Sequence, residues 1–164
     1  KNVKKVLKET KCDAVKLEGG AKIINQVKVL IKNKIPVLGH LGLLPQSNKG
    51  KFKSKGKTTR EIKKLFSDAL LLQKAGVFAI VLECVKTPIA KQITKDLNIP
   101  TIGIGSSVHC DGQVLVTDDL LGLNETKIRF VKKYLNIKKY INLGLKKYAS
   151  DVKSKKYPSK KYSY

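Results

Sequence analysis

The chain has 164 residues, and its 35 basic against 12 acidic side chains give a formal net charge of +23. The length predicts one domain, and 41% hydrophobic with 29% charged residues argues against a wholly disordered chain. No stretch reaches the roughly 18 apolar residues of a membrane helix, and the first residues lack the apolar core of a signal peptide. We therefore expect a cytoplasmic protein with no membrane partner.

Short apolar runs alternate along the chain with longer segments of helical periodicity. The predicted strands cover residues 13–18, 35–40, 77–84, 99–104 and 113–117. The predicted helices cover residues 21–32, a segment from Thr58 or Thr59 to Ala75, a short segment from Pro88, and a segment from about residue 127. Gly76 is placed to end the second helix, and a basic tail over 153–164 is expected to be mobile.

Apolar strands that alternate with helices predict a parallel α/β sheet with right-handed crossovers. An open doubly wound sheet and part of a (β/α)8 TIM barrel both fit this order. Lys16, Glu18, His40 and Glu83 come at the carboxyl ends of predicted strands, where barrel enzymes and open sheets both place their chemistry. The chain has no GxGxxG turn and no early phosphate loop, so we favour the barrel and assign residues 1–152 to it.

The basic charge raises the alternative of a nucleic-acid-binding module. Only two of the 35 basic residues are arginines, however, and the lysines are spread along the chain. Guanidinium groups are preferred for base and phosphate recognition, so nucleic-acid binding is not favoured. Lysines at every second position from 49 to 57 form either a solvated loop or a surface that attracts anionic substrates.

The three cysteines, Cys12, Cys84 and Cys110, are far apart and form no CxxC pair. This spacing predicts neither a disulfide framework nor a zinc site.

Four polar residues are candidates for chemistry. Lys16 and Glu18 are two apart on a strand and so point to one face; they form either a surface ion pair or a cation and substrate site. Glu83 ends an apolar strand, where burial raises a carboxyl pKa and suits a general base; capping a helix or pairing with a lysine is the alternative. His40, between two glycines, faces a substrate pocket or is structural.

Five segments in order resemble ketopantoate hydroxymethyltransferases (3-methyl-2-oxobutanoate hydroxymethyltransferases), which act in pantothenate biosynthesis. They are VKLEGG at 15–20, IPVLGHLGLLPQS at 35–47, VLECV at 81–85, IPTIGIG at 99–105 and CDGQVLV at 110–116. Two departures are Lys86 in place of a usual proline and Ser106–Ser107 in place of an Ala-Gly pair. If the second of these positions needs a positive φ, we expect strain at Ser107.

The resemblance implies that the chain supplies strands four to eight of a barrel. A barrel typically has about 250 residues, so about 90 N-terminal residues are expected to be missing, which agrees with the absence of methionine. The resemblance also implies a homo-oligomer, with a decamer as the suggested size.

The implied reaction transfers a hydroxymethyl group from 5,10-methylenetetrahydrofolate to 3-methyl-2-oxobutanoate through a Mg²⁺-stabilised enolate. The resemblance makes Glu83 the proton-accepting base, Lys16 a contact of the 2-oxo acid and Glu18 a Mg²⁺ ligand, with two further aspartates in the missing part. A related metal-dependent C–C lyase or aldolase that acts on a 2-oxo acid is the alternative.

Overall fold

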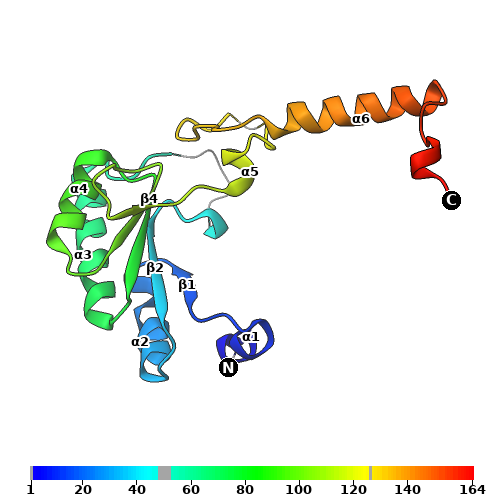
Figure 1. Ribbon diagram of the computed structural model, residues 1–164. Helices are drawn as coiled ribbons and strands as arrows, with labels where there is room; N and C mark the ends of the chain where they lie inside the picture. The colour runs from blue at the N-terminus through cyan, green and yellow to red at the C-terminus, as the bar shows by residue number, and fades with distance from the viewer. Residues whose placement is uncertain (1, 48–52, 126) are drawn as a thin grey trace. The chain divides into compact units, whose positions relative to one another are not determined.

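The computed structural model describes residues 2–47, 53–125 and 127–164. Contacts divide the chain into two compact units, Lys1–Val114 and Leu115–Tyr164. The first unit contains the whole sheet, and the second contains a long helix (Figure 1). The boundary predicted between residues 152 and 153 stays a prediction.

The sheet of the first unit has five parallel strands in the order β1-β2-β3-β4-β5. The strands are β1 (Val15–Glu18), β2 (Val37–Gly42), β3 (Ala79–Glu83), β4 (Thr101–Ile104) and β5 (Gly112–Gln113). Each strand pairs with the next one in the sequence, so the strand order never doubles back as it does in a doubly wound sheet. The predicted parallel α/β sheet is confirmed, and its sequential order is consistent with part of a barrel.

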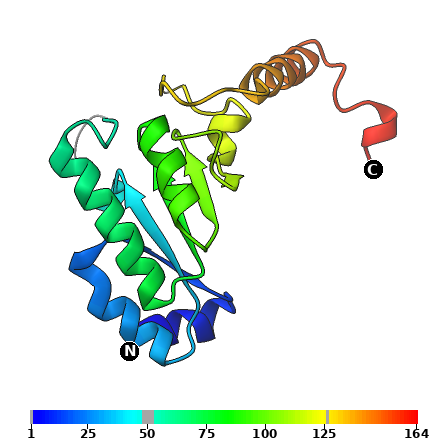
Figure 2. The same ribbon diagram turned by 90° about the vertical axis from the view of Figure 1, so that its left-hand side faces the viewer.

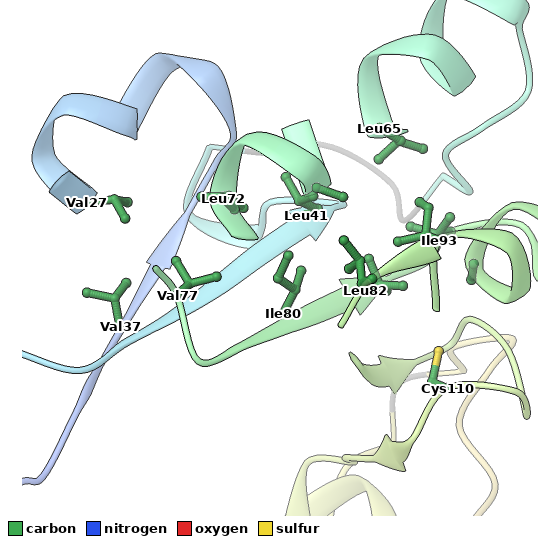
Figure 3. Close-up of a cluster of buried hydrophobic side chains, with 14 residues drawn as sticks. Val27, Val37, Leu41, Leu65, Leu72, Val77, Ile80, Leu82, Ile93 and Cys110 are labelled. Carbon is green, nitrogen blue, oxygen red and sulfur yellow. The ribbon is translucent and has the colours of Figure 1, made fainter. Parts of the chain in front are cut away.

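Three helices lie along one face of this sheet: α2 (Ile24–Lys32), α3 (Thr59–Ala75) and α4 (Thr87–Asp96) (Figures 1 and 2). Alternate strand residues point to this face and are buried against the helices. This core includes Val37, Leu41, Ile80 and Leu82 from the strands, with Val27, Leu72 and Ile93 from the helices (Figure 3). The same alternation sends Lys16, Glu18, His40 and Glu83 to the opposite face.

The predicted ends of α3 are confirmed. The hydroxyl of Thr58 accepts a hydrogen bond from the Glu61 amide at 3.2 Å, which is an N-cap. Gly76 has φ of +94° and ends the helix in the left-handed conformation.

A short 3₁₀ turn, η1 (Ala21–Ile23), connects β1 to α2 and is held by Asp68 of α3. The Asp68 carboxylate accepts a hydrogen bond from the Ala21 amide at 3.0 Å and pairs with Lys64 at 2.5 Å. A Cβ atom on Gly20 would lie 2.0 Å from the Asp68 side chain. Gly20 is therefore needed for α3 to approach this turn.

Helix α1 (Asn2–Thr10) precedes the sheet, and a second 3₁₀ turn, η2 (Pro45–Ser47), follows β2. The sequence pattern did not predict α1. The described residues form a groove of about 840 Å³ between α1, β1 and α2, and none of the four candidate residues lines it.

The second unit contains α5 (Thr117–Leu120), α6 (Ile137–Lys153) and η3 (Lys160–Tyr162). The predicted start of the C-terminal helix, at about residue 127, is wrong. The helix α6 begins ten residues later and is capped by the side chain of Asn136. The Tyr134 and Ile137 amides donate to the carbonyls of Leu120 and Leu121, so the intervening segment is bound to the end of α5. No helix in the described ranges is long and apolar enough to cross a membrane.

Candidate functional site

The register of the sheet brings Glu18, His40 and Glu83 together at the carboxyl ends of three adjacent strands. Glu18 is opposite His40, and Gly42, two residues further along β2, is opposite Glu83. His40 Nε2 lies 3.1 Å from Glu83 Oε2, and His40 Nδ1 lies 3.9 Å from Glu18 Oε1. The histidine ring therefore lies between two carboxylates.

Lys16 is the fourth predicted residue, and it is on the same face of β1 as Glu18 but exposed. Its positive charge opposes the rise in the Glu83 pKa and helps to lower the pKa of His40. The charge of Lys16 thus acts on His40 and Glu83, although no ion pair joins Lys16 to Glu18 or Glu83 among the described residues.

The loops after β1 and β2 hold the first two strands in place. The Gly19 amide donates to the His40 carbonyl at 3.0 Å, and Gly19 has φ of +125°, a conformation that favours glycine. The Gln46 amide donates to Glu18 Oε2 at 3.2 Å. Sequence reasoning missed this contact, because it depends on the path of the backbone after β2.

The backbone around Glu83 is fixed from three sides. Its carbonyl accepts a hydrogen bond from the Leu43 amide at 2.8 Å, and a Cβ atom on Gly42 would lie 2.1 Å from that carbonyl oxygen. Cys84 has φ of +54°, which is uncommon for a residue with a side chain. The Cys84 amide donates a hydrogen bond to the Ile104 carbonyl at 2.9 Å, and the Cys84 carbonyl accepts one from the Lys55 amide at 2.8 Å.

Burial raises the pKa of Glu83, and the negative charge of Glu18 adds to the rise. The expected direction of this shift is confirmed. A higher pKa makes the carboxylate a better proton acceptor. Burial together with the charge of Glu83 raises the pKa of the Cys84 thiol to about 11, so Cys84 stays protonated and is a poor nucleophile at neutral pH.

Burial also lowers the pKa of His40, although the nearby Glu18 charge acts in the opposite direction. A neutral ring is therefore favoured, and its contact with Glu83 is not a pair of full charges. The ring is 1% exposed, and neither nitrogen has an aligned hydrogen bond in the described structure, although the Leu43 backbone beside the ring acts to raise its pKa. The Nε2 contact of 3.1 Å is short enough for a hydrogen bond but is not aligned for one.

The donor set at Glu18 fits a Mg²⁺ ion in part. Carboxylate oxygens are the ligands that Mg²⁺ prefers, and one or two carboxylates with substrate oxygens and waters are a usual shell. The described residues contain no group of three or more metal-ligating side chains. Glu18 would therefore supply one ligand and leave the remaining positions to substrate, water or other carboxylates.

The loop after β4 has no strain at Ser107. Gly105 takes the left-handed conformation with φ of +58°, whereas Ser107 is not among the described residues with positive φ. Ser106 Oγ donates to the Val85 carbonyl at 3.0 Å, and Gln113 Nε2 donates to the Ser107 carbonyl at 2.8 Å. The two serines are thus accommodated by hydrogen bonds to Val85, just after β3, and to Gln113 of β5.

The lysine-rich loop is described only in its second half, because residues 48–52 lie outside the described residues. In that half, Lys55 pairs through its backbone with Cys84 and Lys86, at the carboxyl end of β3. The side chains of Lys53 and Lys57 are exposed.

Comparison with known proteins decides the family. The profile of ketopantoate hydroxymethyltransferase matches residues 1–160. The chain belongs to the ketopantoate hydroxymethyltransferase family. The predicted resemblance is confirmed.

Two relatives within the ketopantoate hydroxymethyltransferase family illustrate the similarity. A protein of Pelagibacter ubique (strain HTCC1062) is 61% identical over 163 residues, and one of Acetivibrio thermocellus is 50% identical over 167 residues. Both are named 3-methyl-2-oxobutanoate hydroxymethyltransferase. These matches cover 99% and 100% of the chain but only 63% and 59% of the relatives, so the chain spans about three fifths of their length.

Proposed function

We propose that the protein containing this chain transfers a hydroxymethyl group from 5,10-methylenetetrahydrofolate to 3-methyl-2-oxobutanoate, which gives ketopantoate for pantothenate biosynthesis. The family match over residues 1–160 carries the proposal. The contact between Glu83 and His40, with Glu18 beside them, supports it, because a buried carboxylate at the end of a parallel strand suits proton abstraction next to a carbonyl.

In this proposal Glu83 removes the proton from C3 of the oxo acid. The C3 carbon then forms a bond to the methylene carbon of the folate as one C–N bond of that carbon breaks, and the released nitrogen gains the proton taken from C3. Water next replaces the second folate nitrogen at the same carbon: its oxygen becomes the hydroxyl of ketopantoate, and a proton goes to the nitrogen of tetrahydrofolate. The raised pKa of Glu83 favours acceptance of the proton. General-base catalysis typically contributes about 10²–10⁴-fold.

Lys16 and Glu18 bind and orient the substrate in the same proposal. The exposed ammonium of Lys16 offsets the negative charge of the oxo acid, and the Glu18 carboxylate would hold a Mg²⁺ ion. When bound, Mg²⁺ would withdraw electrons from the oxo and carboxylate oxygens of the substrate and so acidify its C3 proton.

The sequential parallel sheet with helices on one face supports the further proposal that this chain is an arc of a (β/α)8 barrel, strands four to eight. A homo-oligomer of the suggested decameric size and a cytoplasmic location belong to the same proposal through the family resemblance.

The substitution Glu83→Gln tests the proposed reaction in the protein expressed from its complete gene. We expect turnover to fall about 10²–10⁴-fold, measured both as ketopantoate formation and as exchange of the C3 proton of 3-methyl-2-oxobutanoate in D₂O. Glu9→Gln is the matched control, because Glu9 is an exposed glutamate of α1.

Unchanged turnover in Glu83→Gln would contradict the role of the base. Product formation or C–C cleavage without any folate would favour the lyase or aldolase alternative.

A further inference from the structure

We propose that His40 is a positioning residue that holds the Glu83 carboxylate, and that it is not a ligand of the substrate. This inference rests on the proposed function and assigns to His40 a role other than the predicted substrate contact.

The place of the ring argues against a direct substrate contact. His40 lies in the middle of the sheet, between β1 and β3, and is 1% exposed. Its two nitrogens face Glu18 and Glu83. A substrate ligand needs an accessible polar atom, and both polar atoms of this ring have less than 1 Å² exposed.

Glu83 has no alternative partner of this kind. In residues 2–47, 53–125 and 127–164, His40 is the one side chain in ion-pair contact with the Glu83 carboxylate. The backbone of Glu83 is fixed by Leu43 on one side, and that of Cys84 by Lys55 and Ile104. The side-chain torsions of Glu83 remain to be fixed, and the buried ring at 3.1 Å limits them.

Energetics favour closing this contact into a hydrogen bond. A buried polar atom without an aligned hydrogen bond destabilises a protein, and both ring nitrogens of His40 lack one, although the Leu43 backbone lies beside the ring. The two groups are already 3.1 Å apart, so a hydrogen bond between them needs a change of orientation and not of separation. A neutral imidazole has one hydrogen-bond donor and one acceptor. His40 can therefore pair with Glu83 both as an ionised carboxylate, which accepts, and as a carboxylic acid, which donates after it gains the proton.

Two substitutions of His40 separate positioning from mere packing, in the protein expressed from its complete gene. His40→Gln keeps an amide nitrogen near the place of Nε2, which faces Glu83. His40→Asn keeps one only near the place of Nδ1, which faces Glu18. We expect Asn to lower kcat and the rate of C3 exchange by about 10- to 100-fold, since displacement of about 1 Å costs up to about 10²-fold. Gln should recover most of this loss.

The KM for 3-methyl-2-oxobutanoate should stay within about twofold in both variants, because a positioning residue acts on kcat. A large rise in KM with unchanged kcat would assign His40 to substrate binding and overturn the inference. Equal losses in Gln and Asn that follow a lowered unfolding midpoint would assign it a structural role, which also overturns the inference.

A second measurement needs no folded His40 variant and observes the ring directly in the protein expressed from its complete gene. After ¹⁵N-histidine labelling, the ring signals of His40 are assigned by through-bond correlation to the backbone of that residue. We expect Glu83→Gln to shift the Nε2 resonance of His40, and Glu9→Gln to leave it unchanged. An unshifted resonance in Glu83→Gln would overturn the contact.

Failure of the proposed function is separate from failure of this inference. If the native enzyme neither exchanges the C3 proton nor forms ketopantoate, the proposed function fails whatever the His40 variants do. If it does both and the His40 variants give the contrary results above, only the positioning role fails.

Discussion

The carboxyl end of β3 is shaped by two residues with unusual backbone conformations, Gly42 and Cys84. Gly42 has φ of +97° and lies against the Glu83 carbonyl, whereas Cys84 has φ of +54° with a buried side chain. A left-handed conformation costs about 1–2 kcal/mol for a residue other than glycine. Strain of this kind is often found at functional sites, and here it adjoins the candidate base.

Gly42→Ala should lower the free energy of unfolding by more than about 2 kcal/mol, because a left-handed alanine adds its own cost to the contact with Glu83. The new Cβ would lie 2.1 Å from the Glu83 carbonyl oxygen. Urea unfolding gives the free energy, and C3 exchange should fall as Glu83 is displaced.

The control for this substitution is Gly144→Ala in α6, where a Cβ meets nothing within 4 Å. Alanine should raise helix stability there by roughly 0.5–1 kcal/mol. Similar effects at Gly42 and Gly144 would contradict the proposed close contact.

Glu83→Gln should stabilise the protein at neutral pH while it removes the base. Because the fold raises the pKa of Glu83 above its ordinary value of 4.5, ionisation is penalised in the folded state and stability falls as pH rises through that range. Glutamine removes this penalty. The gain should be present at about pH 7.5 and vanish at about pH 4 in urea unfolding without divalent cations. A gain equal at both pH values would argue against the raised pKa.

At the scale of elements, Asp68 links α3 to the turn that follows Glu18. The buried Asp68 carboxylate accepts a hydrogen bond from the Ala21 amide and forms an ion pair with Lys64. One side chain therefore connects the helical layer to the carboxyl end of β1.

Asp68→Ala should destabilise the protein by about 1–3 kcal/mol, because it leaves the Ala21 amide without an acceptor. Asp68→Asn should cost less, since the amide oxygen still accepts this bond. Asp96→Ala is the control: Asp96 accepts an exposed bond from Gln92 within its own helix α4, and its loss should stay within about 0.5 kcal/mol. Chemical unfolding of the three variants checks this order.

Periodicity and local end signals predict most elements of the first unit, but they miss α1, and the last strand, β5, ends at Gln113 where the predicted strand begins. The apolar run at 77–84 contains β3, and Thr58 and Gly76 mark the two ends of α3. The sequence misplaces α6 because the apolar spacing from Ile128 to Leu135 is compatible with a helix, whereas that segment binds the end of α5. Contacts distant in sequence override local periodicity there.

At the scale of the whole molecule, strand-end positions predict which polar residues share a face. The alternation along β1 is enough to place Lys16 and Glu18 on one face, and the strand-end position of Glu83 brings it to the same edge of the sheet. The contact of His40 with both carboxylates was not predictable, because it depends on the register of three strands. The hydrogen bond from the Gln46 amide to Glu18 depends on the path of the loop after β2, which the spacing of residues in the sequence does not predict.

The net charge of +23 leads to a prediction about association with anionic substrates. Replacing the five lysines at 49, 51, 53, 55 and 57 with glutamine should lower kcat/KM for the oxo acid about tenfold at low ionic strength. The difference should disappear at about 1 M salt, where the Debye length is about 3 Å.

The matched control replaces five lysines of the C-terminal segment, Lys153, Lys155, Lys156, Lys160 and Lys161. A loss of kcat/KM that is equal for both sets would indicate a general effect of net charge. No loss in either set would leave the loop as a solvated surface.

The pairing of β1, β2 and β3 has a consequence for quality control of the purified protein. If β2 slipped by one residue against its neighbours, the flanking Gly39 or Leu41 would take the place of His40, while the content of helix and strand would hardly change. Circular dichroism would not distinguish such a misfolded species from the native protein. A ¹⁵N-imidazole spectrum would reject it, so that signal is the stricter criterion for correctly folded batches.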